Sequence, residues 1–197
     1  RNGGVFLADC RFAVKDGTGL CHARTLPGLL SETLGIRIEE YESLAGGMTY
    51  RGKGTGPLEG SFTAIHFADW VVPAGAQALA VFDETHMASY AATTKNRSGK
   101  GAAYYVGTIA REPEFYDRLM ADAAAAAGVT AMAVPPEDVE VSVRTGPGRR
   151  ILFLVNHSEE DRSVTIPAGG KNLLAGGPAG DEVTLGTYGV AVIEYAI

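Results

Sequence analysis

The chain has 197 residues, of which 46% are hydrophobic and 20% are charged, a composition that indicates a packed globular protein and excludes a disordered one. No apolar run reaches the ~20 residues that a bilayer-spanning helix needs, so no membrane partner is expected. The net charge of -6, with basic residues scattered along the chain, argues against nucleic acid as a partner, because nucleic-acid-binding proteins carry a basic face.

The cysteine content favours a cytoplasmic protein. Cys10 and Cys21 are the only cysteines, which is too few for a disulfide framework, and their spacing does not match a paired-cysteine metal motif. Reduced thiols are typical of the cytoplasm. The chain begins with Arg1, and residues 1–8 read as a helix end followed directly by a strand, so we expect the sequence to start inside a domain.

The first elements are predicted from apolar patterning. Residues 5–8 form a continuous apolar run, which predicts a strand covered on both faces. Residues 9–24 are polar and predict a long loop of the kind that often forms an interface. A helix is expected between an N-cap at Thr25 and a stop at Gly35, because leucines recur on one helical face. Residues 36–41 alternate as a strand.

The middle of the chain predicts further strands and one helix. Residues 46–60 are rich in glycine and predict a flexible loop. Residues 96–101 predict a turn. Strands are expected at residues 61–72, 78–82, 88–94 and 102–107. Residues 112–127 give the strongest helix pattern, with Phe115, Leu119, Met120 and Ala123 on one face and a stop at Gly128.

The composition changes after residue 133, and Pro135–Pro136 indicates a domain boundary. Beyond it, short alternating runs separated by turn signals predict an antiparallel β-sandwich or barrel. These runs are residues 139–144, 150–156, 163–166, 182–185 and 190–195. We therefore expect an α/β domain over residues 1–134 and a small all-β domain over residues 135–197.

The glycine-rich stretch 52–56 does not support a nucleotide site. A dinucleotide fingerprint needs its third glycine three residues after the second, at a helix start. Pro57 and Glu59 occupy the two places where that glycine could stand, and no P-loop spacing occurs. The stretch is therefore expected to be a loop.

Glu39, Glu40 and Glu42 are candidates for a pair of catalytic carboxylates. Glycosidases need two carboxyl groups facing one sugar, ~5 Å or ~6.5–9.5 Å apart. In a strand, Glu39 and Glu40 point to opposite faces, whereas Glu40 and Glu42 share one. Solvation of a strand edge explains all three better than catalysis, so we expect no catalytic role for them.

Cysteines, a histidine and aspartates could also crowd into a metal or nucleophile site near the N-terminus. The candidates are Asp9, Cys10, Asp16, Cys21 and His22. A nucleophilic cysteine of an amidotransferase sits on a tight elbow flanked by glycines. The residues two before and two after Cys10 are not glycine. A buried, inert Cys10 is the better interpretation.

The remaining histidines and aromatic residues are expected to be structural. The histidines are His66, His86 and His157. Trp70, next to Asp69, and the pair Tyr104–Tyr105 predict core or interface aromatics rather than a platform for a sugar. The last module has only Phe153, Tyr188 and Tyr195 as aromatics, so sugar binding by ring stacking is not expected there. No catalytic, cofactor-binding or metal-binding residue is assigned, and no cofactor is expected.

Several segments, in this order and spacing, resemble the middle and C-terminal domains of glycoside hydrolase family 42 β-galactosidases. They are residues 26–30, 34–41, 96–101, 103–108, 154–158 and 188–192. The resemblance covers essentially the whole chain. It implies a parent enzyme with an N-terminal TIM barrel that carries two catalytic glutamates and hydrolyses terminal β-D-galactosides with retention.

The resemblance also implies what this chain itself does. The middle domain would be flavodoxin-like, similar to class I glutamine amidotransferases without their nucleophile, and would build a homotrimer. The last domain would be a small antiparallel β module. By this resemblance we expect the barrel and the first strands and helices of the middle domain to be absent from these residues, so that neither catalytic glutamate maps onto them. We expect a non-catalytic oligomerisation portion that is inactive alone, with the loop at residues 9–24 contacting a neighbouring subunit or the barrel.

Two other functions remain open from the sequence. One is an independent amidotransferase-like enzyme with a β tail, against which the missing elbow at Cys10 counts. The other is an accessory binding module of another glycoside hydrolase, which the shortage of exposed-type aromatics disfavours. A glutaminase assay and a chromogenic galactoside assay together discriminate among the three.

Overall fold

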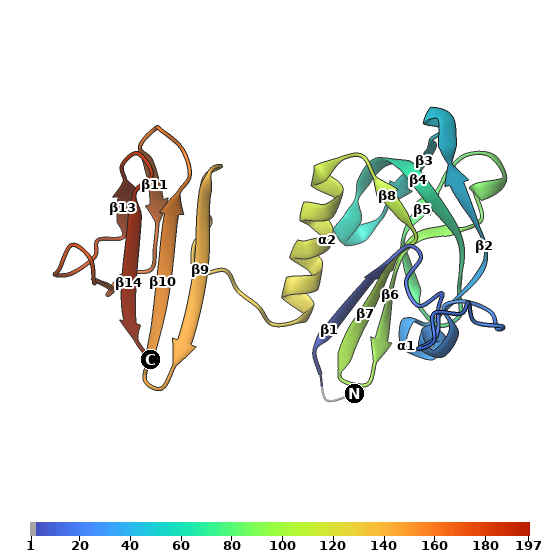
Figure 1. The fold of residues 1–197 in the computed structure, drawn as a ribbon, viewed down its shortest axis with the longest axis horizontal. Helices are drawn as coiled ribbons and strands as arrows, with labels where there is room; N and C mark the ends of the chain where they lie inside the picture. The colour runs from blue at the N-terminus through green and yellow to red at the C-terminus, as the bar shows by residue number, and fades with distance from the viewer. Residues whose placement is uncertain (1–2) are drawn as a thin grey trace. The chain divides into compact units, whose positions relative to one another are not determined.

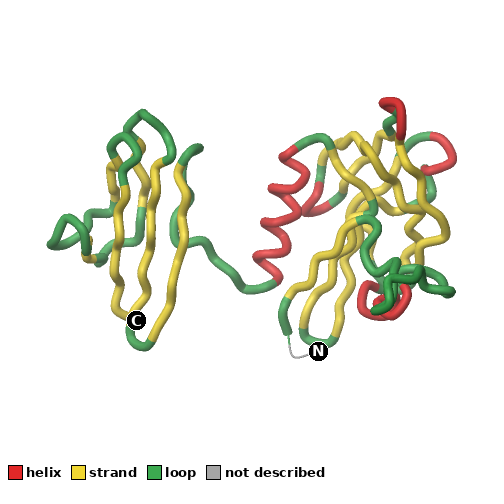
Figure 2. Tube along the Cα trace, viewed as in Figure 1, coloured by secondary structure: helices red, strands yellow, loops and turns green. Residues whose placement is uncertain are grey.

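The computed structural model describes residues 3–197. The chain divides into two compact units, Arg1–Val129 and Thr130–Ile197, and both consist mainly of β-strands (Figures 1 and 2). The α-helices of the described residues are α1 (Ser31–Leu34) and α2 (Pro113–Ala126). Short 3-10 turns are η1 (Gly28–Leu30), η2 (Ala45–Gly47), η3 (Gly56–Leu58) and η4 (Thr85–Met87). The flavodoxin-like α/β fold expected for the first domain is therefore wrong.

One eight-stranded sheet builds the first unit, in the order β1-β7-β6-β5-β3-β4-β2, with β8 paired to β4. The strands are β1 (Val5–Asp9), β2 (Ile36–Leu44), β3 (Tyr50–Gly54), β4 (Gly60–Pro73), β5 (Gln77–Phe82), β6 (Ala91–Ser98), β7 (Gly101–Val106) and β8 (Thr108–Ala110). An additional pairing between β6 and β4 closes a ring of four strands, β3, β4, β6 and β5.

Strand direction explains the error in fold class. Among the described strands of this sheet only β1 and β7 pair in parallel, and the other pairings are antiparallel. Parallel neighbours need a long crossover, usually a helix, whereas antiparallel neighbours need only a tight turn. The segments between β2 and β7 are short turns, so this part of the chain forms hairpins and not βαβ units.

The sequence predicted that β1 would be covered on both faces. In the structure β1 lies at the edge of the sheet, and one face is partly exposed. Its neighbour is β7, with Phe6 opposite Ala103. Ala8 is buried, but Leu7 is 38% exposed. A continuous apolar run thus occurs here in an edge strand.

The glycine-rich segment expected to be a flexible loop contains β3, a strand in the interior of the sheet between β4 and β5. Tyr50 opens it and is buried. A Cβ atom at Gly52 would overlap the ring of Phe62, and one at Gly54 would overlap the carbonyl oxygen of Leu58. Glycine in a strand marks such close approaches, so the glycines are required by packing and not by flexibility.

The two α-helices lie close to their predicted places. Helix α2 buries Phe115, Leu119 and Ala123 in the largest core cluster, as predicted, but Met120 is 57% exposed. Each fully buried leucine or phenylalanine contributes about 1.5–3 kcal/mol. Helix α1 begins at Ser31, so Thr25 is not its N-cap, whereas Gly35 ends it with a φ of 63°.

The second unit holds a four-stranded antiparallel sheet, β12-β14-β10-β9, and a two-stranded sheet, β11-β13. The strands are β9 (Val139–Gly146), β10 (Arg149–Asn156), β11 (Arg162–Thr165), β12 (Lys171–Asn172), β13 (Glu182–Leu185) and β14 (Val190–Ala196). Its own core includes Leu152, Leu154, Ile193, Val164 and Leu185, all nearly inaccessible. The unit therefore has a hydrophobic core separate from those of the first unit.

Candidate functional site

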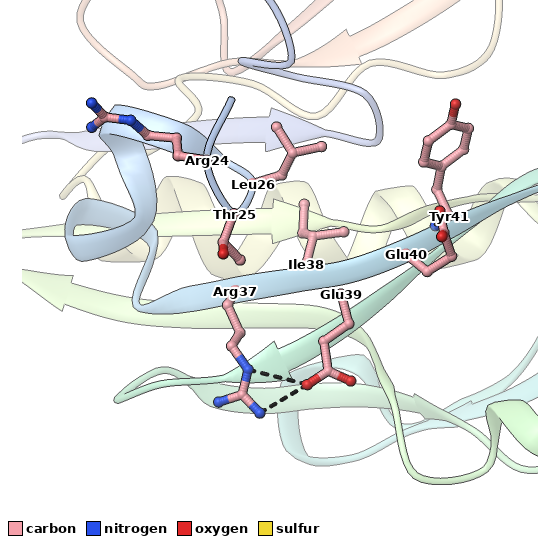
Figure 3. A pocket seen from close by; sticks show the side chains of 8 residues that line it. All are labelled: Arg24, Thr25, Leu26, Arg37, Ile38, Glu39, Glu40 and Tyr41. Carbon is pink, nitrogen blue, oxygen red and sulfur yellow. Dashed lines mark hydrogen bonds and ion pairs between the residues drawn. The ribbon is translucent and has the colours of Figure 1, made fainter. Parts of the chain in front are cut away.

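A shallow concavity of about 470 Å³ lies along the edge strand β2 (Figure 3). It is lined by Arg24, Thr25, Leu26, Arg37, Ile38, Glu39, Glu40 and Tyr41. The loop before α1 is fixed against β2 by a hydrogen bond of 2.8 Å from the Ile38 amide to the Leu26 carbonyl oxygen. The Arg37 guanidinium donates to Glu39 at 2.9 Å. Because the three candidate glutamates lie on this strand, it is the first place to look for chemistry.

A β-bulge in β2 changes which glutamates share a face. The register against β4 shifts after Ile38, and a bulge places two residues opposite one, which re-aims the side chains. Glu39 and Glu42 both contact aromatic side chains packed beside the strand. Glu40 instead accepts a hydrogen bond of 3.0 Å from the amide of Tyr41. The predicted pairing of Glu40 with Glu42 on one face is therefore wrong.

The carboxylates of Glu39 and Glu42 both accept hydrogen bonds from neighbouring side chains. The Tyr90 hydroxyl donates to Glu39 at 3.3 Å. The Tyr50 hydroxyl donates to Glu42 at 2.9 Å, and the Nε2 atom of His86 lies 3.3 Å from the same carboxylate oxygen. Burial, and then the bond to Glu42, raises the pKa of the Tyr50 phenol. These contacts give the glutamates a structural role as acceptors.

The aromatic side chains that contact Glu39 and Glu42 also pack against one another, in a group that the sequence did not reveal. The Trp70 ring centroid lies 5.1 Å from that of Tyr90 and 5.5 Å from that of His86. His86 in turn lies 5.7 Å from Tyr50. The indole N–H of Trp70 is covered, and no acceptor for it lies within the part of the chain that the structure describes.

Cys10 directly follows β1, the place that a nucleophile would take after a parallel strand, but its surroundings oppose nucleophilic chemistry. Burial, and then the carboxylates of Asp69 and Asp9, together raise the pKa of the thiol to about 11. The thiolate is the reactive form of cysteine. At neutral pH the Cys10 thiol is therefore protonated and poorly reactive.

The other N-terminal candidates do not gather around Cys10 into one metal or nucleophile site. Asp16 accepts hydrogen bonds from the amide and hydroxyl of Thr18, at 2.8 Å and 2.7 Å, and so closes its own turn. Cys21 is an exposed free thiol. His22 packs against Gly28. Within residues 3–197 no group of three histidine, cysteine or acidic residues could hold a metal ion.

A buried carboxyl lies beneath the loop that follows β1. Asp69 is 1% exposed, and the Tyr105 hydroxyl donates to it at 2.5 Å. Burial raises the pKa of Asp69, although the hydrogen bonds from Tyr105 and from the Arg11 backbone lower it. Arg11 has a φ of 68°, and its guanidinium lies 3.6 Å from the Tyr41 ring centroid. Asp69 therefore anchors a strained turn to the sheet.

Asp69 predicts a specific pH dependence of stability. Since its folded pKa is raised above the ordinary 3.8, folded Asp69 holds its proton over an interval in which the unfolded chain has lost it. Its contribution to the free energy of unfolding therefore falls as pH rises through that interval. We expect the free energy of unfolding of the native chain, minus that of Asp69→Asn, to fall in urea titrations from pH 3 upward, about where unfolded aspartate ionises. A difference that stays flat or rises with pH contradicts this assignment.

Tyr104, next in the chain to Tyr105, belongs to a second polar group. Its hydroxyl donates to Asp122 at 2.6 Å, and the Lys95 ammonium donates to the same oxygen at 2.9 Å. Both tyrosines are fully buried, which confirms the prediction of core aromatics for this pair. They join β7 to its neighbours through carboxylates that the sequence did not single out.

The remaining candidates lie apart from one another. His66 is exposed, with a φ of 65°. His157 has its Nε2 atom 3.3 Å from the Glu140 carboxylate on the surface of the second unit. In the same unit Tyr195 is buried, and Tyr188 is 60% exposed. No helix within residues 3–197 is long and apolar enough to cross a bilayer.

Each of the two units matches a family model of known proteins. The family model described as the β-galactosidase trimerisation domain matches residues 1–130, and the β-galactosidase C-terminal domain matches residues 138–194. The chain is 30% identical over 200 residues to β-galactosidase BglY of Alicyclobacillus acidocaldarius, covering 98% of this chain and 29% of that protein. It is 28% identical over 196 residues to β-galactosidase LacZ of Heyndrickxia coagulans, covering 98% and 28%.

A solved structure agrees with these relatives. The β-galactosidase of Bacillus circulans sp. alkalophilus superposes with a TM-score of 0.91 at 27% identity, covering 98% of this chain and 29% of that chain. The chain thus spans less than a third of the length of the relatives it matches. With family models covering most of both units, the chain belongs to the glycoside hydrolase family 42 β-galactosidases and comprises their trimerisation and C-terminal domains.

Proposed function

We propose that this chain is the non-catalytic oligomerisation portion of a β-galactosidase, whose complete form hydrolyses terminal β-D-galactosides with retention and assembles as a homotrimer. The observation that carries the proposal is the match of residues 1–130 to the β-galactosidase trimerisation domain. A cytoplasmic setting and a domain boundary near residue 134 belong to the same proposal. Two free cysteines and the consecutive prolines at 135 and 136 support them.

The surface of the first unit supports a role in assembly. Large apolar side chains are exposed along the loop after β1 and the turn before α1. They are Phe12 at 40%, Leu20 at 69% and Leu29 at 73%. Exposed apolar surface marks a site of protein contact where it is contiguous, and these three side chains belong to one segment of the chain. The glutamates of β2 are meanwhile occupied as acceptors, which supports an inactive chain.

Two measurements test the proposal: the mass of the assembled species and the hydrolysis of a β-galactoside. We expect sedimentation velocity to show a species of three 20.6 kDa chains, and we expect no hydrolysis of a chromogenic β-galactoside. A monomer at every concentration contradicts trimerisation by this portion. Galactoside cleavage that Glu39→Gln or Glu42→Gln abolishes contradicts the non-catalytic assignment. Glutamine hydrolysis abolished by Cys10→Ser would instead support an amidotransferase.

A further inference from the structure

Two surfaces of the first unit carry opposite charge. We define the acidic aromatic surface as the rings of Trp70, His86 and Tyr90 together with the carboxylates of Glu39 and Glu42. The side chains of Glu39, Glu42 and His86 are 41%, 31% and 47% exposed. The Arg37 guanidinium pairs with one oxygen of Glu39 at 2.9 Å, so Glu42 supplies the carboxylate of this surface that no arginine or lysine of residues 3–197 neutralises. Carboxylates beside aromatic faces attract a cation twice, through its charge and through the ring quadrupoles.

The basic hairpin is the complementary surface, defined here as the turn between β6 and β7 with Arg97 and Lys100. Residues 85–110 contain these two cations and Lys95, and no acidic residue. Lys95 is paired with Asp122. Arg97 and Lys100 form no ion pair with any of residues 3–197, and they line a concavity of about 540 Å³.

The hairpin is also held in a fixed position. Ser98 pairs with Gly101 across the turn, where Gly99 has a φ of 62°. The side-chain amide of Asn96 donates to the carbonyl oxygen of Thr33, at 2.9 Å, and so ties the hairpin to α1. A preorganised cationic surface loses little conformational freedom when a partner binds it.

The two surfaces cannot meet within one copy. Tyr90 directly precedes β6, and the basic hairpin lies at the opposite end of that strand, where β6 turns into β7 (Figure 1). A strand of 8 residues at about 3.3 Å per residue separates its ends by about 25 Å. Two different, complementary patches on one molecule are the requirement for a head-to-tail contact, which closes into a ring when the rotation is suitable.

We propose that the basic hairpin of one copy docks on the acidic aromatic surface of a second copy. This inference rests on the proposed trimer and specifies the surfaces that form it. Exposed ion pairs alone contribute little, so Trp70 and Tyr90 carry an essential part of the contact by covering the arriving cation. Like charges placed opposite each other in such a contact oppose association strongly.

Charge reversal in the 197-residue chain tests the contact. We expect Arg97→Glu with Lys100→Glu, and separately Glu39→Lys with Glu42→Lys, to weaken self-association at least ~10-fold in sedimentation velocity. All four substitutions in one chain restore opposite charges and should recover most of the association. Lys171→Glu with Arg111→Glu changes the net charge as the hairpin variant does, at exposed positions outside both surfaces and outside the loop at residues 9–24, and should leave association unchanged.

The outcomes separate this inference from the proposed function. If the native chain forms trimers and reversal of the hairpin charges leaves them intact, or the fourfold variant fails to recover association, the contact is wrong and the trimer stands. If the native chain stays monomeric, both fail. Circular dichroism checks folding of each variant, and Lys100→Glu combined with Glu42→Lys repeats the rescue if the fourfold variant unfolds.

Discussion

Replacing Gly54 with alanine is expected to cost about 3 kcal/mol or more of the free energy of unfolding. A Cβ atom there would overlap the backbone carbonyl oxygen of Leu58. The obstacle is main chain, so no side-chain rotation relieves it. Strand β3, which holds Gly54, pairs on both sides, and any shift of its backbone disturbs β4 and β5 together. Urea unfolding followed by circular dichroism measures the effect.

Gly17→Ala is the matched control for this substitution. Nothing lies within 4 Å of a Cβ atom at Gly17, and its φ is outside the left-handed region. The change is expected to be neutral or stabilising, within about 1 kcal/mol. Equal effects at the two positions would show that β3 is not packed against η3 as described.

The same glycines explain why β3 was missed from the sequence. A strand is recognised in a sequence by its alternating apolar side chains. Close packing against Phe62 and Leu58 leaves room only for glycine at positions 52 and 54, so β3 lacks that alternation. The helix α2 and the strands β4, β5 and β7 have no such conflict. Apart from Met120, which is exposed on α2, their apolar periodicity agrees with their burial, and the predictions of these elements are confirmed.

Strand direction could not be obtained from patterning. A buried parallel strand and an edge strand such as β1 both present a short apolar run. The resemblance to family 42 enzymes led correctly to the family and, through the flavodoxin-like domain it implied, to a wrong fold class. The turn at Gly99 and Lys100 was readable as a hairpin, and hairpins alone would have indicated antiparallel pairing.

The candidate site was only partly predictable for a similar reason. Alternation in β2 fails at the bulge after Ile38, so Glu39 and not Glu40 shares the aromatic group with Glu42. The bond between Tyr105 and Asp69 joins residues 36 apart in the chain, and nothing in local spacing indicates it. Long-range polar contacts of this kind depend on the topology of the sheet.

In the second unit, Asn156→Ala is expected to lower the free energy of unfolding by about 2–4 kcal/mol, because several groups lose their partner at once. Asn156 is 1% exposed, and its amide nitrogen donates to the carbonyl oxygens of Glu160 at 2.7 Å and Gly186 at 2.9 Å. Its side-chain oxygen accepts from the amide of Ser158 at 3.0 Å. One side chain thus joins the end of β10 to the turn that precedes β14.

Asn172→Ala removes side-chain hydrogen bonds to the backbone at a solvent-exposed turn and serves as the control. Its side-chain oxygen accepts from the amides of Leu174 and Ala175, each at 3.0 Å. Water can replace these bonds, so a loss below about 1 kcal/mol is expected. Thermal unfolding of both variants should show a large decrease in Tm for Asn156→Ala alone. Equal decreases would mean that burial of the Asn156 amide does not stabilise the second unit.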